Sequence, residues 1–188
     1  MSAGRILHAD QLRPVPWRNG QGITRELAVM PPGAGMEDFL WRVSLADVVG
    51  AAPFSRFPGV DRTIVLIEGA GFRMTLDEAQ IHELTTPCVP FAFPGEAAVA
   101  VALAGGPTRD FNLMLRRGRA SGSIEVWNDT AARAVPPDLV LLHLVHGRAR
   151  TPEGALAPGD SWLPDSTAAP GPVKVEGVAL AVRVVVAG

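Results

Sequence analysis

Short apolar segments, separated by glycine and proline, follow one another along the whole chain. Many are rich in Val, Ile, Leu, Phe or Trp, which favour strands, and several alternate apolar with polar positions. This pattern predicts strands at about 22–30, 39–46, 62–68, 71–76, 89–93, 97–104, 110–116, 123–127, 139–146, 161–163, 173–176 and 178–186. Only "ADVVG" and "TLDEAQIHEL" indicate helical turns, and the second would equally form a hairpin. So many short strands with turns between them favour an all-β sandwich or barrel.

A faint internal repeat suggests how these strands are organised. Residues 62–78 and 139–154 each contain an apolar strand, a glycine turn and a second short strand. The segment "PGDSWLP" also resembles the turn-strand-proline element of cupin barrels. We therefore expect a bicupin in which two cupin-like jelly-roll halves, residues 1–120 and 121–188, pack as one compact unit.

The segment "VPWRNGQGITRELAV", residues 15–29, places an arginine among aliphatic residues. Strict alternation puts Arg25 on the same face of its strand as three aliphatic side chains. A buried guanidinium is unfavourable unless an anionic or strongly hydrogen-bonding group meets it. Two explanations stay open, because Arg25 would meet either an anionic ligand or an internal carboxylate such as Asp61 or Asp110.

The residues needed for metal or nucleophilic chemistry are not at the expected positions. Metal-dependent cupins place His-x-His and a Glu on one strand, where this chain has Val65 and Ile67. His143 and His146 are three apart, so on a strand they would face opposite ways, and each is expected to be solvent-facing or internally hydrogen-bonded. Cys88 is the only cysteine and has no base nearby in sequence, so it is expected to be a packing residue. We expect no metal, no cofactor and no catalytic nucleophile.

Composition and charge exclude some classes of partner. The chain has 188 residues, of which 47% are hydrophobic, and 17 Lys and Arg against 19 Asp and Glu give a net charge of -2. This charge provides no general attraction to nucleic acid or anionic lipid. The longest apolar runs are too short to span a bilayer, and the N-terminal segment does not resemble a signal peptide. We expect a cytoplasmic protein with no nucleic-acid or membrane partner, and leave open whether it forms a homodimer through a strand edge.

Four segments, taken in order, carry a resemblance to a known family. They are "PWRNGQGITRELAV", "WRVSLADV", "GAAPFSRFPGVDRTIVLIEGAGFRMTL" and "DFNLMLRRG", and together they closely resemble the HutD/Ves family from about Val15 to Gly118. Members often carry three consecutive glycines where this chain has Gly20-Gln21-Gly22, a difference that concerns the shape of the loop. Family members look like metal-free bicupins. HutD-type proteins are associated with bacterial histidine utilisation, and Ves-type relatives with cold or stress response.

The resemblance implies a pocket formed by polar residues of the N-terminal half. The implied ligand-binding residues are Asn19, Thr24, Arg25, Glu26, Arg42, Ser44, Asp61, Arg62, Asp110 and Asn112. Polar residues that alternate with apolar ones on a strand can simply face water. The inner face of a barrel can instead line a ligand cavity with a few convergent polar groups.

The pathway suggests the chemistry of the ligand. Urocanate, imidazolone propionate, formiminoglutamate and formylglutamate all bear a carboxylate, which an arginine binds through two parallel hydrogen bonds. Arg25 or Arg42 would hold the carboxylate, and Asn19, Ser44 or Asn112 would contact the remaining amide or ring nitrogen. We therefore expect a small-molecule carboxylate-binding protein with a regulatory role in histidine utilisation or a related stress response.

Two other function classes stay open. The first is a metal-independent enzyme, an isomerase, lyase or hydrolase of a small acid, in which Asp61, Glu26 or Asp110 acts as acid or base. The second is a structural or protein-interaction module whose polar strand residues form an internal network. Turnover of a small acid would identify the enzyme, and a cavity too small for any ligand would favour the module.

Overall fold

A computed structural model describes residues 4–165 and 171–188 of the chain, and its elements are almost entirely strands. The strands are β1 (Arg5–Leu7), β2 (Pro14–Pro16), β3 (Gly22–Met30), β4 (Trp41–Val48), β5 (Val60–Gly69), β6 (Phe72–Leu76), β7 (Gln80–Leu84), β8 (Phe91–Pro94), β9 (Val99–Leu103), β10 (Thr108–Arg116), β11 (Ala120–Trp127), β12 (Ala132–Arg133), β13 (Leu139–Thr151), β14 (Gly154–Leu156), β15 (Ser161–Leu163) and β16 (Val173–Val186). A short 3₁₀ turn, η1 (Ala9–Gln11), is the helical element of the described residues. None of their helices is long and apolar enough to cross a membrane.

Both segments that indicated helical turns form strands instead. "ADVVG" begins within β4, and "TLDEAQIHEL" forms the hairpin of β6 and β7, as its second interpretation allowed. The two strands expected at 173–176 and 178–186 are one strand, β16, which continues through Gly177. A Cβ on Gly177 would lie 2.1 Å from the carbonyl oxygen of His146, so the close pairing of β13 and β16 requires glycine there.

The chain divides into two units, one formed by Arg13–Ser121 with Ala187–Gly188 and one formed by Met1–Leu12 with Gly122–Val186. The division at 121/122 lies within one residue of the expected boundary. The first twelve residues, expected in the N-terminal half, cluster with the C-terminal unit because β1 pairs antiparallel with β15. That the two halves pack as one compact unit stays a prediction.

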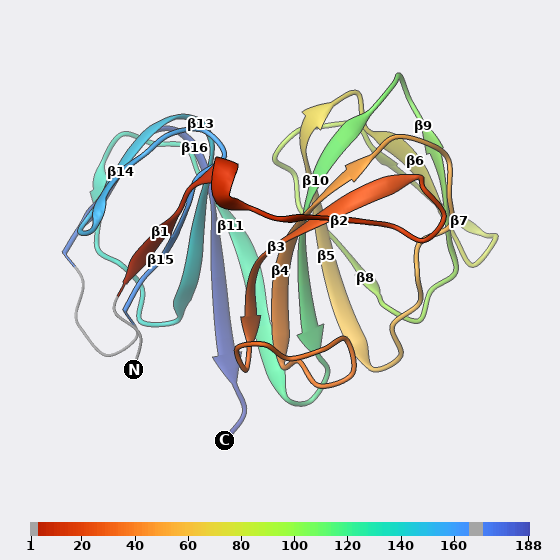
Figure 1. Ribbon diagram of the computed structural model, residues 1–188, viewed down its shortest axis with the longest axis horizontal. Coiled ribbons are helices and arrows are strands. Elements are labelled where there is room, and N and C mark those ends of the chain that lie inside the picture. Colours follow the sequence, from red (N-terminus) through yellow and green to blue (C-terminus); the bar gives the residue numbers. More distant parts are fainter. Residues whose placement is uncertain (1–3, 166–170) are drawn as a thin grey trace. The chain divides into compact units, whose positions relative to one another are not determined.

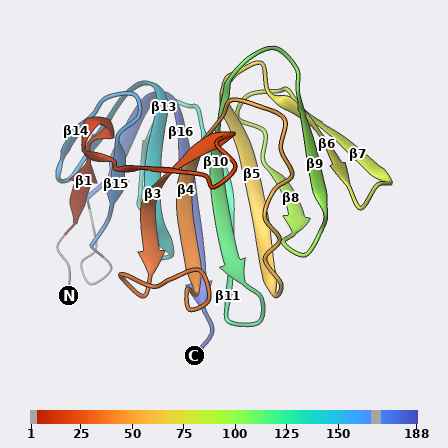
Figure 2. The ribbon, with the colours of Figure 1, turned by 45° about the vertical axis from the view of Figure 1, so that its right-hand side comes forward.

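The N-terminal unit is a sandwich of two sheets. Its six-stranded sheet has the order β2-β3-β4-β10-β5-β8, and its three-stranded sheet has the order β7-β6-β9 (Figures 1 and 2). The core of this unit contains Ile64 and Leu66 of β5 together with Phe72 and Met74 of β6, all of them buried. Apolar side chains at every second position of these strands therefore hold the two sheets together.

The C-terminal unit is built on β13 and β16, which pair along most of their length in a seven-stranded sheet. Its core includes Leu142, Leu144 and Trp162, each fully buried. His143 is buried with its Nδ1 2.9 Å from the hydroxyl of Ser161, while His146, beyond a shift in register, is exposed. The expected all-β fold of two cupin-like halves is confirmed, with stacked sheets rather than closed barrels.

Candidate functional site

The pairing of β4, β10 and β5 brings several polar residues to one face of the six-stranded sheet. Asn112 of β10 lies opposite Ser44 of β4, and Met114 lies between Arg42 of β4 and Arg62 of β5. Because neighbouring strands are about 4.8 Å apart, the Cα atoms of the two arginines are about 10 Å apart across Met114. Two cations thus flank one patch of the sheet.

This face borders a cavity of about 660 Å³ that lies entirely within the N-terminal unit. Apart from the sheet, its wall includes Trp17, Met36, Phe54 and Phe57 from the connecting segments. Eight of the ten expected binding residues line it, namely Asn19, Thr24, Glu26, Arg42, Ser44, Arg62, Asp110 and Asn112. These eight residues therefore border one cavity, whereas their binding role stays a prediction.

Arg62 is the most deeply buried cation of the cavity, with 9% of its surface exposed. Its guanidinium lies 4.8 Å from the ring centre of Phe93 and 5.4 Å from the ring centres of Phe54 and Phe57. Burial, reinforced by the positive charge of Arg42, lowers the pKa of Arg62 to about 10. The group is therefore still a cation at neutral pH, held by aromatic faces rather than by a carboxylate.

The polar contacts of Arg62 are few and long. Its Nη1 donates to the carbonyl oxygen of Ser55 and its Nη2 to Oδ1 of Asn112, each at 3.5 Å, and its buried Nε has no hydrogen-bond partner among the described residues. Hydrogen bonds of this length are at the outer limit of the interaction. Because a buried charge is unfavourable without an opposite charge, Arg62 is the group in the cavity that most needs an anion.

Asp110 is the second unsatisfied group. It is fully buried between Ala46 of β4 and Leu66 of β5, and neither of its carboxylate oxygens has a hydrogen-bond partner in the described parts of the chain. Burial, with a smaller effect of the Asp47 carboxylate, raises the pKa of Asp110 to about 8. At pH 7 this side chain is therefore mostly a neutral carboxylic acid.

Other expected residues of the cavity already have internal partners. Nε of Arg42 donates to Oε2 of Glu26 at 2.8 Å, so this second cavity arginine is paired. The indole N–H of Trp17 donates to the hydroxyl of Thr24 at 2.7 Å, and Oδ1 of Asn19 accepts the backbone N–H of Gln21 at 3.0 Å. These bonds hold the wall of the cavity in place.

The glycine loop before β3 is shaped by close packing. A Cβ on Gly22 would lie 2.7 Å from the carbonyl oxygen of Asp47 and 2.8 Å from Cε3 of Trp17. The backbone N–H of Trp17 also donates to the carbonyl oxygen of Gly22 at 2.9 Å. Only glycine at this position lets the indole close over the start of β3.

Arg25 does not line the cavity, which corrects the expectation that it holds the ligand. It lies opposite Leu45 of β4, and its guanidinium bonds the carboxylate of Asp47, not that of Asp61 or Asp110. Asp47 also accepts a hydrogen bond of 2.5 Å from Nε of Arg109. Burial would raise the pKa of Asp47, but the bonds from the two arginines outweigh it and hold that pKa below its usual value.

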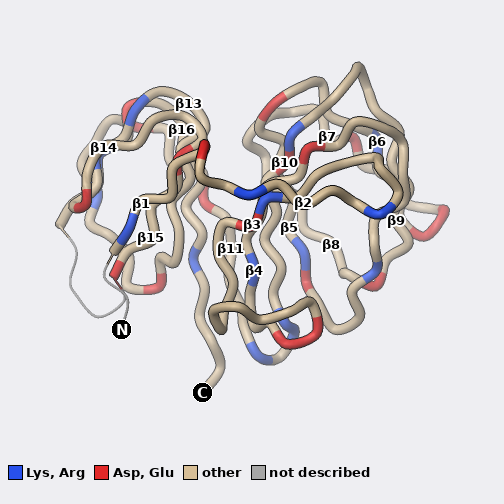
Figure 3. The backbone as a smooth tube through the Cα atoms, viewed as in Figure 1, with Lys and Arg blue, Asp and Glu red and all other residues tan. Residues whose placement is uncertain are grey.

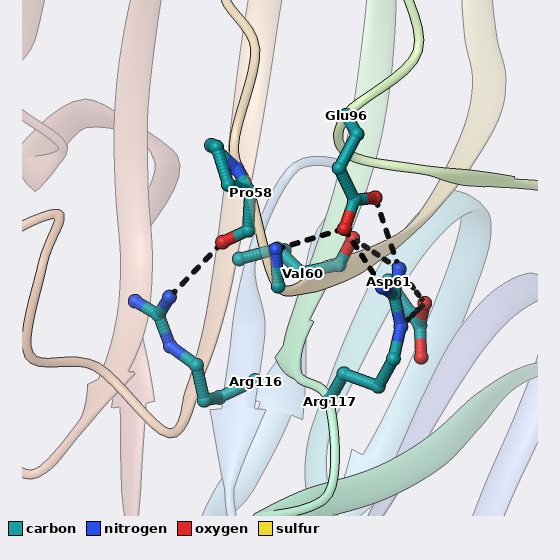
Figure 4. Close-up of polar contacts among 7 residues, drawn as sticks. Pro58, Val60, Asp61, Glu96, Arg116 and Arg117 are labelled. Atoms are coloured by element: carbon teal, nitrogen blue, oxygen red, sulfur yellow. Dashed lines mark hydrogen bonds and ion pairs between the residues drawn. The ribbon is translucent and has the colours of Figure 1, made fainter.

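Asp61 also lies outside the cavity, although its neighbour in sequence, Arg62, lines it. Figure 4 shows Asp61 beside Glu96 and Arg117, with Arg117 bonding both carboxylates. Asp61 is the second residue of β5, and its outward-facing side chain is 53% exposed. It belongs to an ion-pair cluster on the surface, and this placement removes it from the implied pocket.

Comparison with known proteins identifies the family. The HutD family model matches residues 9–179. The chain belongs to the HutD family. It is 37% identical over 133 residues to an uncharacterised 21.2 kDa protein in the hutC 3′ region of Pseudomonas putida, an alignment that spans 71% of this chain and 68% of that protein.

A second sequence relative and a solved structure agree with this assignment. The protein Ves of Citrobacter koseri is 40% identical over 115 residues, which span 61% of this chain and 59% of Ves. The structure of HutD from Pseudomonas fluorescens SBW25, described in a formate condition, superposes with a TM-score of 0.88 at 31% identity, covering 99% of this chain and 100% of that one. The fold of this HutD-family chain is thus that of HutD itself.

The donors in the cavity of this HutD-family protein suit an anion better than a cation. In residues 4–165 and 171–188, no three His, Cys, Asp or Glu side chains lie close enough together to hold a metal ion. Figure 3 shows basic and acidic positions interspersed along the chain. The distinctive feature of the cavity is one buried arginine, Arg62, whose hydrogen-bond donors are largely unused.

Sequence analysis missed the aromatic part of the site. Phe54 and Phe57 come from a proline-rich connection between β4 and β5, and alternation assigns no face to such a segment. The available signal was the spacing of two phenylalanines just before Arg62 in "PFSRFPGVDR". A connecting segment with aromatic residues beside a strand arginine indicates a possible ligand wall, since ligand cavities are lined largely by apolar groups.

Proposed function

We propose that this protein binds a small carboxylate in the cavity and acts as a regulator in histidine utilisation or a related stress response, without converting its ligand. The observation that carries the proposal is the buried guanidinium of Arg62, which lacks an anionic partner among the described residues. A carboxylate would supply the opposite charge and accept two parallel hydrogen bonds along one edge of the Arg62 guanidinium.

The surroundings of Arg62 favour a metabolite-sized ligand. A volume of about 660 Å³ lies within the range of small-molecule sites, which speaks against a purely structural module. Asn112 and Ser44, adjacent on the sheet, offer an amide and a hydroxyl beside the guanidinium. Arg62 therefore replaces Arg25 in the expected role, and Arg42, already paired with Glu26, is secondary.

The pathway assignment is supported by the relatives. One relative is named for its place in the hutC 3′ region. Membership of the HutD family makes the acids of histidine breakdown the first ligands to test.

The test is a thermal-shift titration with urocanate, imidazolone propionate, formiminoglutamate, formylglutamate and glutamate, followed by calorimetry. A ligand at a hundredfold its Kd should stabilise the protein by about 2.7 kcal/mol. We expect such a shift with at least one acid and its loss in Arg62→Met, whose side chain keeps the apolar stem. If no acid stabilises the protein, the proposed function is wrong.

A metal-independent enzyme is the second candidate, favoured by Asp110. A buried carboxyl whose pKa lies near 8 has the property of a general acid or base working near neutral pH. The same five acids should then be converted when incubated with the protein, as followed by proton NMR. Conversion that Asp110→Asn abolishes would replace the regulator by an enzyme.

A further inference from the structure

Arg62 and Asp110 lie at opposite ends of the same polar row. Asp110 and Asn112 are two residues apart on β10, about 7 Å, and both line the cavity. The guanidinium of Arg62 reaches Oδ1 of Asn112 at 3.5 Å, so it lies over that residue and not over Asp110. Two groups of opposite potential charge thus border one cavity, and no hydrogen bond joins Asp110 to Arg62.

A ligand with a carboxylate alone would satisfy only one of these groups. As an acid, Asp110 can donate one hydrogen bond to an anion, which leaves its second oxygen buried without a donor. As a carboxylate, Asp110 would repel the anion. Two parallel N–H donors on a planar cation would satisfy both oxygens together.

We propose, on the basis of the proposed function, that the ligand is dipolar, with its carboxylate on Arg62 and a planar nitrogen cation of the amidinium type on Asp110. Binding converts the carboxylic acid of Asp110 into a carboxylate, and the released proton passes to the solvent. No bond of the ligand is broken. The neutral cavity acid and the buried cavity cation are then both paired by one molecule.

The other charged groups around the cavity are consistent with this distribution. Arg18, Glu26 and Arg42 also line it, and Glu26 is held by Arg42. Asp47, whose negative charge acts on Asp110, bonds Arg25 and Arg109. The Asp110 carboxyl therefore has no neighbouring cation bonded to it among the described residues, and a cation supplied by the ligand would be its first direct partner.

Formiminoglutamate and formylglutamate form a matched pair for the test, because a formamidinium cation in one replaces a neutral formamide in the other. Calorimetry at pH 7 in two buffers of different ionisation enthalpy measures both affinity and proton release. We expect formiminoglutamate to bind about tenfold to hundredfold more tightly than formylglutamate and to release close to one proton. Its affinity should increase as the pH rises toward 8, because less work is then needed to deprotonate Asp110.

The control variant is Asp110→Asn, which preserves shape and is neutral at every pH. It should abolish proton release and bring the two affinities together. Equal affinities in the native protein, or cation binding without proton release, would overturn the dipolar ligand but leave carboxylate binding intact. If neither compound binds the native protein, the dipolar ligand is overturned, and the proposed function is overturned as well if none of the five acids binds.

Discussion

The arginines on the two faces of the six-stranded sheet have different kinds of partner. On the face opposite the cavity, Arg25 and Arg109 both bond Asp47, and Arg109 also reaches Glu68 at 3.1 Å. On the cavity face, Arg62 is more deeply buried yet lies against aromatic rings and two distant oxygens. Folding alone thus explains the first face, whereas on the second the proposed ligand would supply the missing charge.

The paired face should be the more sensitive to mutation. Asp47→Ala would leave Arg25 and Arg109 close together without their shared carboxylate, and their guanidinium groups are only partly exposed. We expect the free energy of unfolding to fall by about 2 kcal/mol, less than for a fully buried ion pair because water screens these partly exposed groups. Urea denaturation measures the loss, and a change below about 0.5 kcal/mol would show that this face does not depend on its ion pairs.

The unpaired carboxyl group on the cavity face should make the stability of the protein depend on pH. The pKa of Asp110 is raised to about 8, so between pH 4 and 8 the folded protein holds a proton that the unfolded chain has released. The free energy of unfolding should therefore fall as the pH rises through this window, by up to about 1.4 kcal/mol per pH unit. Asp110→Asn should remove this contribution, which urea denaturation at pH 5 and pH 7 measures. An identical pH dependence in both proteins would mean that Asp110 ionises normally.

Replacing Arg116, the second arginine of β10, should have the smallest effect. Arg116 donates to the carbonyl oxygens of Met36, Glu37 and Pro58 and lies 4.9 Å from the ring centre of Phe39 (Figure 4 shows its contact with Pro58). Because Met36 lines the cavity, Arg116→Ala should loosen one wall and lower stability by about 1 kcal/mol. Hydrogen exchange of the amides of residues 36–39 should become faster in this variant. Unchanged exchange would mean that contacts other than those of Arg116 hold this segment in place.

Alternation and turn residues predicted most of the strands, because a sheet with one buried face has apolar residues at every second position of its strands. They missed β1, β2 and β14, each three residues long, and the two-residue β12, which are fixed by pairing with a neighbour rather than by their own pattern. The helical alternative for "TLDEAQIHEL" failed because Asp77 and Glu78 adopt positive φ in a tight turn.

The sequence indicated which residues belong to the candidate site, but not which of them contact one another. Strict alternation put Arg25 and Val29 on one face, but a bulge between Glu26 and Ala28 shifts the register and places Val29 opposite Arg42. The partner of Arg25, Asp47, comes from the next strand, and one sequence does not reveal the register between strands. Arg62 was among the expected residues, but its burial depends on Phe54, Phe57 and Phe93 from other segments. Asp61 was misplaced because it is exposed between Val60 and Arg62, which are both buried, so its side chain points away from the face that carries Arg62.

The most direct test of the account compares Arg25→Met with Arg62→Met in both stability and ligand binding. We expect Arg25→Met to lower the free energy of unfolding by about 1–3 kcal/mol and to leave carboxylate affinity unchanged. Arg62→Met should be as stable as the native protein, or more stable, and should lose the ligand. If Arg62→Met unfolds far more easily while its folded form still binds the acid, the unpaired arginine serves the fold, and the central claim is contradicted.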